Sequence, residues 1–189
     1  MICAKILYCY PICILSWVPR MICVILKKKS AMNKYTKISV MVVTCVAAGY
    51  FAGVATQSGV NTWYPPLEKP VFNPPSWIFA PVWTALYIMM GVAAGLVWNK
   101  IDDHKEAVQK ALLFFAIQLG LNILWSFLFF GMGNPLLALI EIVVLWLMIY
   151  ETYAKFVKID KIAGYLFIPY LIWVSFATVL NGSIWWLNR

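Results

Sequence analysis

The chain has 189 residues, of which 63% are hydrophobic and only 12% charged, and its formal net charge is +8. Soluble domains usually carry about 45–50% apolar and about 25% charged residues. The composition therefore excludes an ordinary soluble enzyme, a disordered regulator and a nucleic-acid-binding domain, and it predicts an integral membrane protein in contact with the lipid bilayer.

The first 31 residues differ from the rest of the chain. They contain a broken apolar run followed by Lys27, Lys28 and Lys29, which is the reverse of the order in a signal peptide. Five of the 15 basic residues and none of the acidic residues lie in this segment, so the remaining chain has a net charge of +3. We interpret residues 1–31 as an extension from a mis-assigned start, with the true chain beginning at Met32. The alternative is a poorly formed extra span or anchor.

Five apolar segments follow, and each is long enough to cross a bilayer. A membrane-spanning helix needs about 20 residues at about 1.5 Å per residue. Continuous apolar character excludes the alternating pattern of barrel strands. The sequence therefore predicts an all-α membrane protein, a five-transmembrane-helix bundle formed by residues 32–189. The predicted spans are residues 38–60, 77–98, 107–131, 136–156 and 162–187.

The basic residues predict the orientation of this bundle. With an inside amino terminus, eight lysines of residues 32–189 lie on the inner side, and only Lys69 and Arg189 lie on the outer side. Lysine and arginine are enriched in cytoplasmic loops. We therefore predict an inside amino terminus and an outside carboxyl terminus.

The connection between the first two spans, residues 57–76, is the only long one, and it is predicted to lie outside. It contains five prolines together with Trp63, Tyr64 and Phe72. Proline fixes φ and removes a backbone donor, so the segment is stiff but not regularly helical. It is interpreted either as a lid over one end of the bundle or as a linker whose aromatic residues lie at the membrane interface.

The sequence offers few groups for acid–base or metal chemistry. The single histidine, His104, lies in a charged loop, and the five cysteines show no Cys-x-x-Cys spacing. Hydrolase and nucleotide-binding motifs are absent from the sequence. We therefore expect no metal site and no required cofactor. Glu141 is the one acidic residue well inside a span, and it is either functional or a hydrogen-bonded structural group.

Aromatic, amide and small residues share one face on three of the predicted helices, because residues three or four apart lie on the same side of a helix. The faces contain Trp83, Tyr87, Met90 and Ala94 in the second span, Gln118, Asn122, Trp125, Ser126 and Phe129 in the third, and Trp173, Ala177, Leu180, Asn181 and Ile184 in the fifth. These faces suit the lining of a site for a flat, mostly apolar ligand. The alternative is helix packing in which the amides form hydrogen bonds between helices.

Two pairs of glycines have the spacing that permits close helix contact. They are Gly49 with Gly53, and Gly91 with Gly95. Such pairs allow two backbones to approach, either within the bundle or between protomers.

Several segments carry longer motifs, in the order WYPPLEKP (63–70), PPSWIFAPVWTALY (74–87), LNILWS (121–126), FFG (129–131) and PYLIWVSFATVLN (169–181). They resemble the signature of the TspO/MBR family, which comprises bacterial tryptophan-rich sensory proteins and the mitochondrial translocator, or peripheral benzodiazepine receptor. The resemblance covers about residues 33–189 and leaves residues 1–31 outside. It implies a five-helix bundle, a homodimer, and a ligand cavity beneath the first outer loop.

The resemblance also implies the ligands. Family members bind porphyrins such as protoporphyrin IX and haem, and isoquinoline-type small molecules. Eukaryotic members also bind cholesterol, but the tyrosine of that recognition pattern is absent after Asn181. We therefore expect no sterol role and a prokaryotic cell membrane. The ligand-binding residues carried over by motif are Tyr64, Pro74, Trp83, Tyr87, Asn122, Trp125, Trp173, Ala177 and Asn181.

Light- and oxygen-dependent porphyrin degradation has been proposed for bacterial members. The resemblance implies a catalytic, photochemical role for Trp83 and Trp173, since an excited porphyrin can exchange an electron with an oxidisable indole without a histidine or a metal. We expect a porphyrin- or tetrapyrrole-binding membrane sensor or regulator. The alternatives are a transporter of porphyrins or other apolar ligands, and an interaction scaffold for other membrane proteins.

Overall fold

The computed structural model describes residues 32–189, which form helices and contain no strand. Both interpretations of residues 1–31, a mis-assigned start or an extra anchor, concern a segment outside the described residues. The elements in chain order are α2 (Lys34–Asn61), the 3-10 turn η1 (Ser76–Ile78), α3 (Phe79–Asn99), α4 (Lys105–Ser126), the π-helical turn η2 (Phe127–Gly131), α5 (Pro135–Ile159), α6 (Lys161–Tyr165) and α7 (Ile168–Leu187).

Five helical stretches within residues 32–189 are long and apolar enough to cross a membrane. They are α2, η1 with α3, α4 with η2, α5, and α6 with α7, and their mean hydropathies lie between 1.7 and 2.0. Their bounds differ from the predicted spans by only a few residues. The prediction of an all-α bundle with five spans is confirmed, and the chain is an integral membrane protein.

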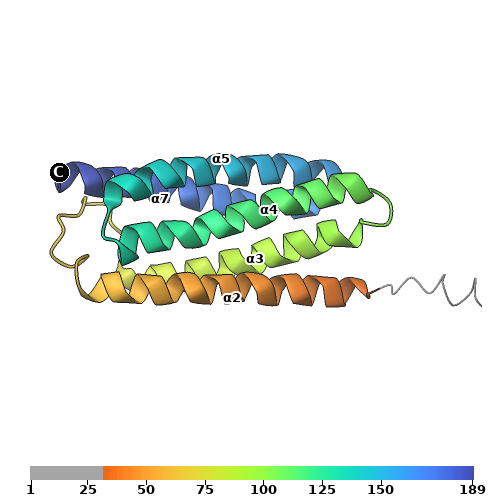
Figure 1. The fold of residues 1–189 in the computed structure, drawn as a ribbon, viewed down its shortest axis with the longest axis horizontal. Helices are drawn as coiled ribbons and strands as arrows, with labels where there is room; N and C mark the ends of the chain where they lie inside the picture. The colour runs from red at the N-terminus through yellow and green to blue at the C-terminus, as the bar shows by residue number, and fades with distance from the viewer. Residues whose placement is uncertain (1–31) are drawn as a thin grey trace, which may run out of the picture. The chain divides into compact units, whose positions relative to one another are not determined.

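Consecutive membrane-spanning helices of residues 33–189 run antiparallel to one another (Figure 1). α2 lies along α3 and α4, while α5 lies along α4 and α7. The long loop of residues 62–75, the turn between α4 and α5, and the carboxyl end of α7 gather at one end of the bundle, which we call the loop end. The connection between α3 and α4 lies at the opposite end (Figure 1).

Side-chain caps fix where several helices begin. Asn134 accepts a hydrogen bond from the backbone N–H of Leu137 at 3.0 Å, and Pro135 occupies the first turn of α5, where its missing donor costs nothing. Gly133 precedes this cap with a φ of 60°, a conformation that glycine adopts without strain. The result is a tight turn that forces α4 and α5 to run antiparallel.

The fifth predicted span is divided, whereas the sequence predicted one helix over residues 162–187. α6 ends at Tyr165 and α7 begins at Ile168, so that Pro169 falls in the first turn of a new helix. A proline deeper inside a helix would remove a hydrogen bond and clash with the preceding turn. α6 also packs closely on α5, where a Cβ at Gly164 would lie 2.9 Å from the Cα of Val157.

Three of the four paired glycines serve contacts within this chain. A Cβ at Gly95 would lie 2.5 Å from the Cα of Ile38, and a Cβ at Gly91 would overlap the backbone of Val42. Gly49 faces the ring of Tyr87, and a Cβ at Gly49 would lie 2.5 Å from the edge of that ring. The close approach of α2 and α3 therefore depends on these glycines.

Aromatic packing fills the half of the bundle away from the loop end. Phe115 stacks on Phe156 with 6.0 Å between ring centroids, and Phe167 lies edge-on to Phe156 at 5.1 Å. All three side chains are buried. This packed half supports the loop end, where the helices surround a cavity instead.

Candidate functional site: an aromatic cavity at the loop end

A cavity of about 1080 Å³ lies at the loop end, surrounded by α2, α3, α4, η2, α7 and residues 62–75. Ligand pockets usually measure about 300–1,000 Å³, so this one has room for a large ligand. The structure brings together all nine residues that the sequence predicted for ligand binding. Lining the cavity are Tyr64, Pro74, Trp83, Tyr87, Asn122, Trp125, Trp173, Ala177 and Asn181.

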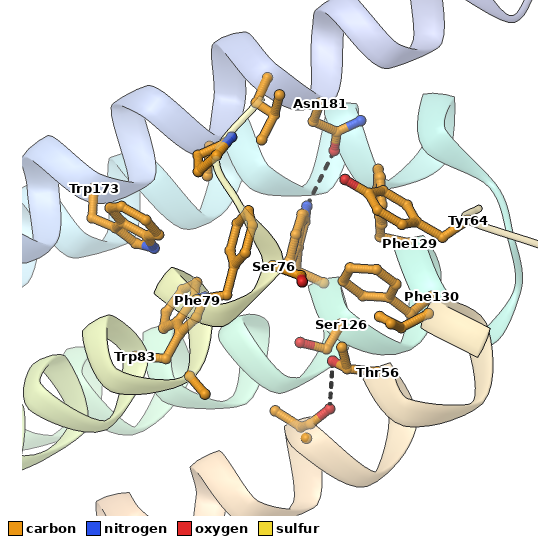
Figure 2. A pocket seen from close by; sticks show the side chains of 18 of the residues that line it. Thr56, Tyr64, Ser76, Phe79, Trp83, Ser126, Phe129, Phe130, Trp173 and Asn181 are labelled. Carbon is orange, nitrogen blue, oxygen red and sulfur yellow. Dashed lines mark hydrogen bonds between the residues drawn. The ribbon is translucent and has the colours of Figure 1, made fainter. Parts of the chain in front are cut away.

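One wall of the cavity consists of aromatic rings from α3 and α7. Figure 2 shows Phe79, Trp83 and Trp173 together on one side. The Trp83 and Trp173 ring centroids are 6.5 Å apart with an interplanar angle of 89°, and Phe79 lies 6.0 Å from Trp173. Edge-to-face pairs of this kind are a favoured geometry for aromatic rings. They join α3 to α7 through side chains and leave ring faces toward the cavity.

The opposite wall is formed by rings of η2 and of the long loop (Figure 2). Phe129 stacks on Trp125 with centroids 5.2 Å apart and planes at 19°. Tyr64 lies 5.6 Å from Phe130 and 6.2 Å from Phe129. A flat, apolar ligand placed between the two walls would contact aromatic rings on both sides.

A chain of buried hydrogen bonds begins at two residues that line the cavity, Tyr87 and Asn122, and continues to two that do not, Tyr170 and Gln118. The Tyr87 hydroxyl donates to Oδ1 of Asn122, whose Nδ2 donates to the Tyr170 hydroxyl at 2.8 Å. The Tyr170 hydroxyl in turn donates to Oε1 of Gln118 at 3.1 Å. All four side chains are buried, and buried polar groups are stable only when they are paired. Asn122 therefore both lines the cavity and holds α3, α4 and α7 together.

The indole N–H groups of the cavity differ in their hydrogen bonds. Nε1 of Trp125 donates to Oδ1 of Asn181 at 3.2 Å, and Nδ2 of Asn181 donates to the carbonyl of Pro135 at 2.8 Å. The indole N–H groups of Trp83 and Trp173 have no hydrogen-bond partner within residues 32–189. These two donors are available to a ligand.

The long loop is fastened over the cavity on two sides. Nε1 of Trp63 donates to the carbonyl of Phe130 at 2.9 Å. On the other side, the backbone N–H of Glu68 donates to Oδ1 of Asn188 and the carbonyl of Glu68 accepts from Nδ2 of Asn188, both at 2.9 Å. Of the two interpretations of this loop, the structure supports the lid.

Tyr64 is the ring that the lid places against the cavity. Burial raises the pKa of Tyr64 above its usual value, while its hydrogen bond to Oδ1 of Asn73 at 3.2 Å opposes that rise. Tyr64 is therefore a neutral hydroxyl at physiological pH. It offers a polar contact at the edge of an otherwise aromatic surface.

A model described as the TspO/MBR family matches residues 41–187. The chain belongs to the TspO/MBR family. It is 45% identical over 144 residues to the tryptophan-rich protein TspO of Chlorobaculum tepidum, covering 76% of this chain and 90% of that protein. It is 44% identical over 128 residues to the tryptophan-rich sensory protein of Cereibacter sphaeroides, covering 68% and 78%. It is 35% identical over 127 residues to the translocator protein of Sus scrofa, covering 67% and 75%.

The region that matches the TspO/MBR family contains every residue that lines the cavity, including several that sequence reasoning missed. Phe79 precedes Trp83 by one helical turn, so its spacing was a usable signal. Phe130 is turned inward by the π-helical η2, which the sequence did not predict. Thr56 on α2 and Lys69 in the lid also line the cavity, and neither was among the predicted ligand-binding residues, although Lys69 lies within the motif WYPPLEKP.

Glu141, singled out by its position inside a span, does not line the TspO/MBR cavity. Its side chain is buried, and neither carboxylate oxygen has a hydrogen-bond partner within residues 32–189. Groups of three or more His, Cys, Asp or Glu that could hold a metal are also absent from these residues. The polar and aromatic groups that line the cavity are therefore aromatic rings, amides, hydroxyls and the ammonium group of Lys69.

Proposed function

We propose that this protein is a membrane sensor or regulator that binds a tetrapyrrole, protoporphyrin IX or haem, in the aromatic cavity. The observation that carries the proposal is the pair of aromatic walls that face each other across about 1080 Å³ (Figure 2). A porphyrin is a broad, flat π system, and aromatic pairs contribute about 0.5–1.5 kcal/mol each beyond their burial of area. Flat isoquinoline-type compounds would occupy the same walls and compete.

The relatives support the same proposal. One of them carries the name tryptophan-rich sensory protein, and the match with this chain covers 78% of that protein. The cavity walls of this chain hold three of its ten tryptophans, Trp83, Trp125 and Trp173. A sensory protein needs a site for its ligand. The cavity lined by these three tryptophans is the site that we propose.

The orientation and assembly belong to the proposal as well. We place the loop end outside and the lysine-rich end inside a prokaryotic cell membrane, because eight of the ten basic residues of residues 32–189 are predicted at the inner side. We also propose a homodimer. Cysteine labelling of the loop at Val71, which is fully exposed, tests the orientation in intact cells, and the mass of the purified protein tests the dimer.

A titration tests the binding proposal. Protoporphyrin IX added to the purified protein should quench tryptophan fluorescence to saturation, and Trp83→Ala or Trp173→Ala should weaken binding. Trp186→Ala is the matched control, because Trp186 is exposed and lies outside the cavity. Quenching that does not saturate, or equal affinities in all four proteins, would contradict the proposal.

The free indole N–H groups and close rings of Trp83 and Trp173 favour a second, photochemical activity on the bound porphyrin. An excited porphyrin would take an electron from an indole and pass it to O2 as superoxide. The indole radical cation would then recover an electron from the porphyrin, and superoxide would add to the oxidised macrocycle and break its conjugation, so that O2 is the net oxidant. Illumination of the complex in air should then bleach the Soret band faster than in a Trp83→Phe, Trp173→Phe double variant. Equal bleaching rates in the unmodified protein and the double variant would contradict the photochemical activity and leave porphyrin binding as the proposed function.

A further inference from the structure

The charges around the cavity are strongly one-sided. Among the residues of the described chain that line it, Lys69 is the only one with a charged side chain, and the lining contains no Asp or Glu. The rest of the lining is aromatic, aliphatic, amide or hydroxyl. A ligand that carried a negative charge would therefore find a single cationic partner in the cavity and no acidic group to repel it.

Lys69 is held in place by neutral groups. Its Nζ donates to the carbonyl of Pro65 at 3.0 Å and to that of Leu67 at 3.1 Å, and it lies 4.8 Å from the centroid of the Tyr64 ring. An ammonium group has three donors, and the two carbonyls use two of them. Within residues 32–189 no carboxylate forms a salt bridge with Lys69, so its positive charge has no opposite charge beside it.

The lid fixes the position of this lysine relative to the walls. The residue before it, Glu68, is bound through both backbone groups to Asn188 at the end of α7. Trp63 fastens the start of the same loop to Phe130. With its backbone fixed on both sides, Lys69 has little backbone freedom, while its flexible stem lets the ammonium group move at the rim of the cavity.

We propose that Lys69 binds a carboxylate of the ligand and makes the site selective for flat, apolar anions over their neutral analogues. This inference rests on the proposed function and specifies the chemical class of its ligand. The apolar ring of the ligand lies between the aromatic walls, and a carboxylate at its edge reaches the ammonium group at the rim. The carboxylate replaces one or both backbone carbonyls, since a hydrogen bond between two charged groups is stronger than one to a neutral carbonyl.

The apolar surroundings strengthen this selection. Attraction between opposite charges increases as the effective dielectric constant falls, and most residues that line the cavity with Lys69 are apolar or aromatic. Glu68, the acidic residue nearest in sequence, is exposed and does not line the cavity. It therefore does not compete inside the cavity for the ammonium group.

The test compares protoporphyrin IX, which has two carboxylates, with its neutral dimethyl ester. Both are titrated against the full-length protein and its Lys69→Met, Lys69→Arg and Lys161→Met variants, with the Soret band as the readout. Lys161 is a matched control because it is exposed, begins α6 at the opposite end of the bundle, and does not line the cavity. Retained ester binding shows that a variant is folded with its cavity intact.

We expect Lys69→Met to weaken binding of the acid by roughly tenfold or more while leaving the ester unchanged, because only the acid loses a charge-assisted hydrogen bond. Lys69→Arg should retain most of the affinity for the acid, and Lys161→Met should match the unmodified protein. If Lys69→Met binds the acid as well as before, or loses acid and ester alike, selectivity by Lys69 is overturned while porphyrin binding stands. If the unmodified protein binds neither porphyrin, the proposed function itself is overturned.

Discussion

Trp83 of α3 and Trp173 of α7 meet edge-to-face at 6.5 Å, with their planes at 89° and with both indole N–H groups unbonded within the described chain. A tryptophan buried in a protein core usually finds a partner for its N–H group. The pair therefore has the character of a binding surface. The two rings also connect α3 to α7 beside the cavity.

The lid should control how quickly a ligand leaves. Asn188→Ala removes both hydrogen bonds to the backbone of Glu68, so the lid loses its attachment to α7. We expect the dissociation rate of protoporphyrin IX to rise several-fold, as measured by stopped-flow displacement. Asn188→Asp keeps the acceptor for the Glu68 N–H group but loses the donor, and its rate should fall between the two. Equal rates in all three proteins would show that the lid does not gate the cavity.

The buried hydrogen-bond chain that begins at Tyr87 and Asn122 should contribute to stability. Asn122→Ala leaves the buried hydroxyls of Tyr87 and Tyr170 each without one partner, which costs about 1–3 kcal/mol for an unsatisfied buried group. Tyr87→Phe breaks only the first of these bonds and should cost less. Denaturant unfolding in detergent measures both. A smaller loss for Asn122→Ala than for Tyr87→Phe would contradict this account of the network.

Hydropathy and spacing were enough to predict the spans and the three helix faces that contribute to the cavity. Apolar length determines where a helix can cross, and the spacing of Trp83 with Tyr87, and of Trp173 with Ala177, put each pair on one face. Such signals are local, because they depend only on the geometry of a single helix. Most cavity residues that carried a local pattern were therefore found, and Phe79, one helical turn before Trp83, is the exception.

Contacts between distant segments could not be predicted in this way. Asn188 binds Glu68 across 120 positions of the sequence, and Trp63 binds Phe130 across 67. The residues next to Asn188 and Trp63 in the sequence carry no pattern that predicts these hydrogen bonds. The π-helical turn that carries Phe130 packs against α2, and no pattern in the sequence of α2 predicted this contact.

The glycines between α2 and α3 should tolerate no side chain. Gly91→Ala places a Cβ against the backbone of Val42, and overpacking of this kind costs about 1–3 kcal/mol. Gly120→Ala is the control, because a Cβ there meets no atom within 4 Å. It should be neutral or stabilise the helix by up to about 1 kcal/mol. Thermal unfolding in detergent measures the stability of both variants. Equal midpoints for Gly91→Ala and Gly120→Ala would show that α2 and α3 are not closely packed at Gly91.

Glu141 should lower the stability of the protein and have no effect on porphyrin binding. Its buried carboxylate lacks a hydrogen-bond partner within residues 32–189, and burying an unpaired polar group costs about 1–3 kcal/mol. Glu141→Leu should therefore raise the free energy of unfolding and leave the affinity for protoporphyrin IX unchanged. A less stable Glu141→Leu protein would show that the carboxylate has a partner in the membrane-embedded molecule.

Filling the cavity while keeping every tryptophan tests the central claim most directly. Ala177→Trp inserts a large side chain between the walls, whereas Val179→Trp places the same side chain on the exposed face of α7. The measurement is a titration with protoporphyrin IX followed by the Soret band, which does not depend on tryptophan fluorescence. We predict that Ala177→Trp abolishes saturable binding and that Val179→Trp binds like the unmodified protein. Unchanged binding by Ala177→Trp would place the porphyrin outside the cavity and contradict the account.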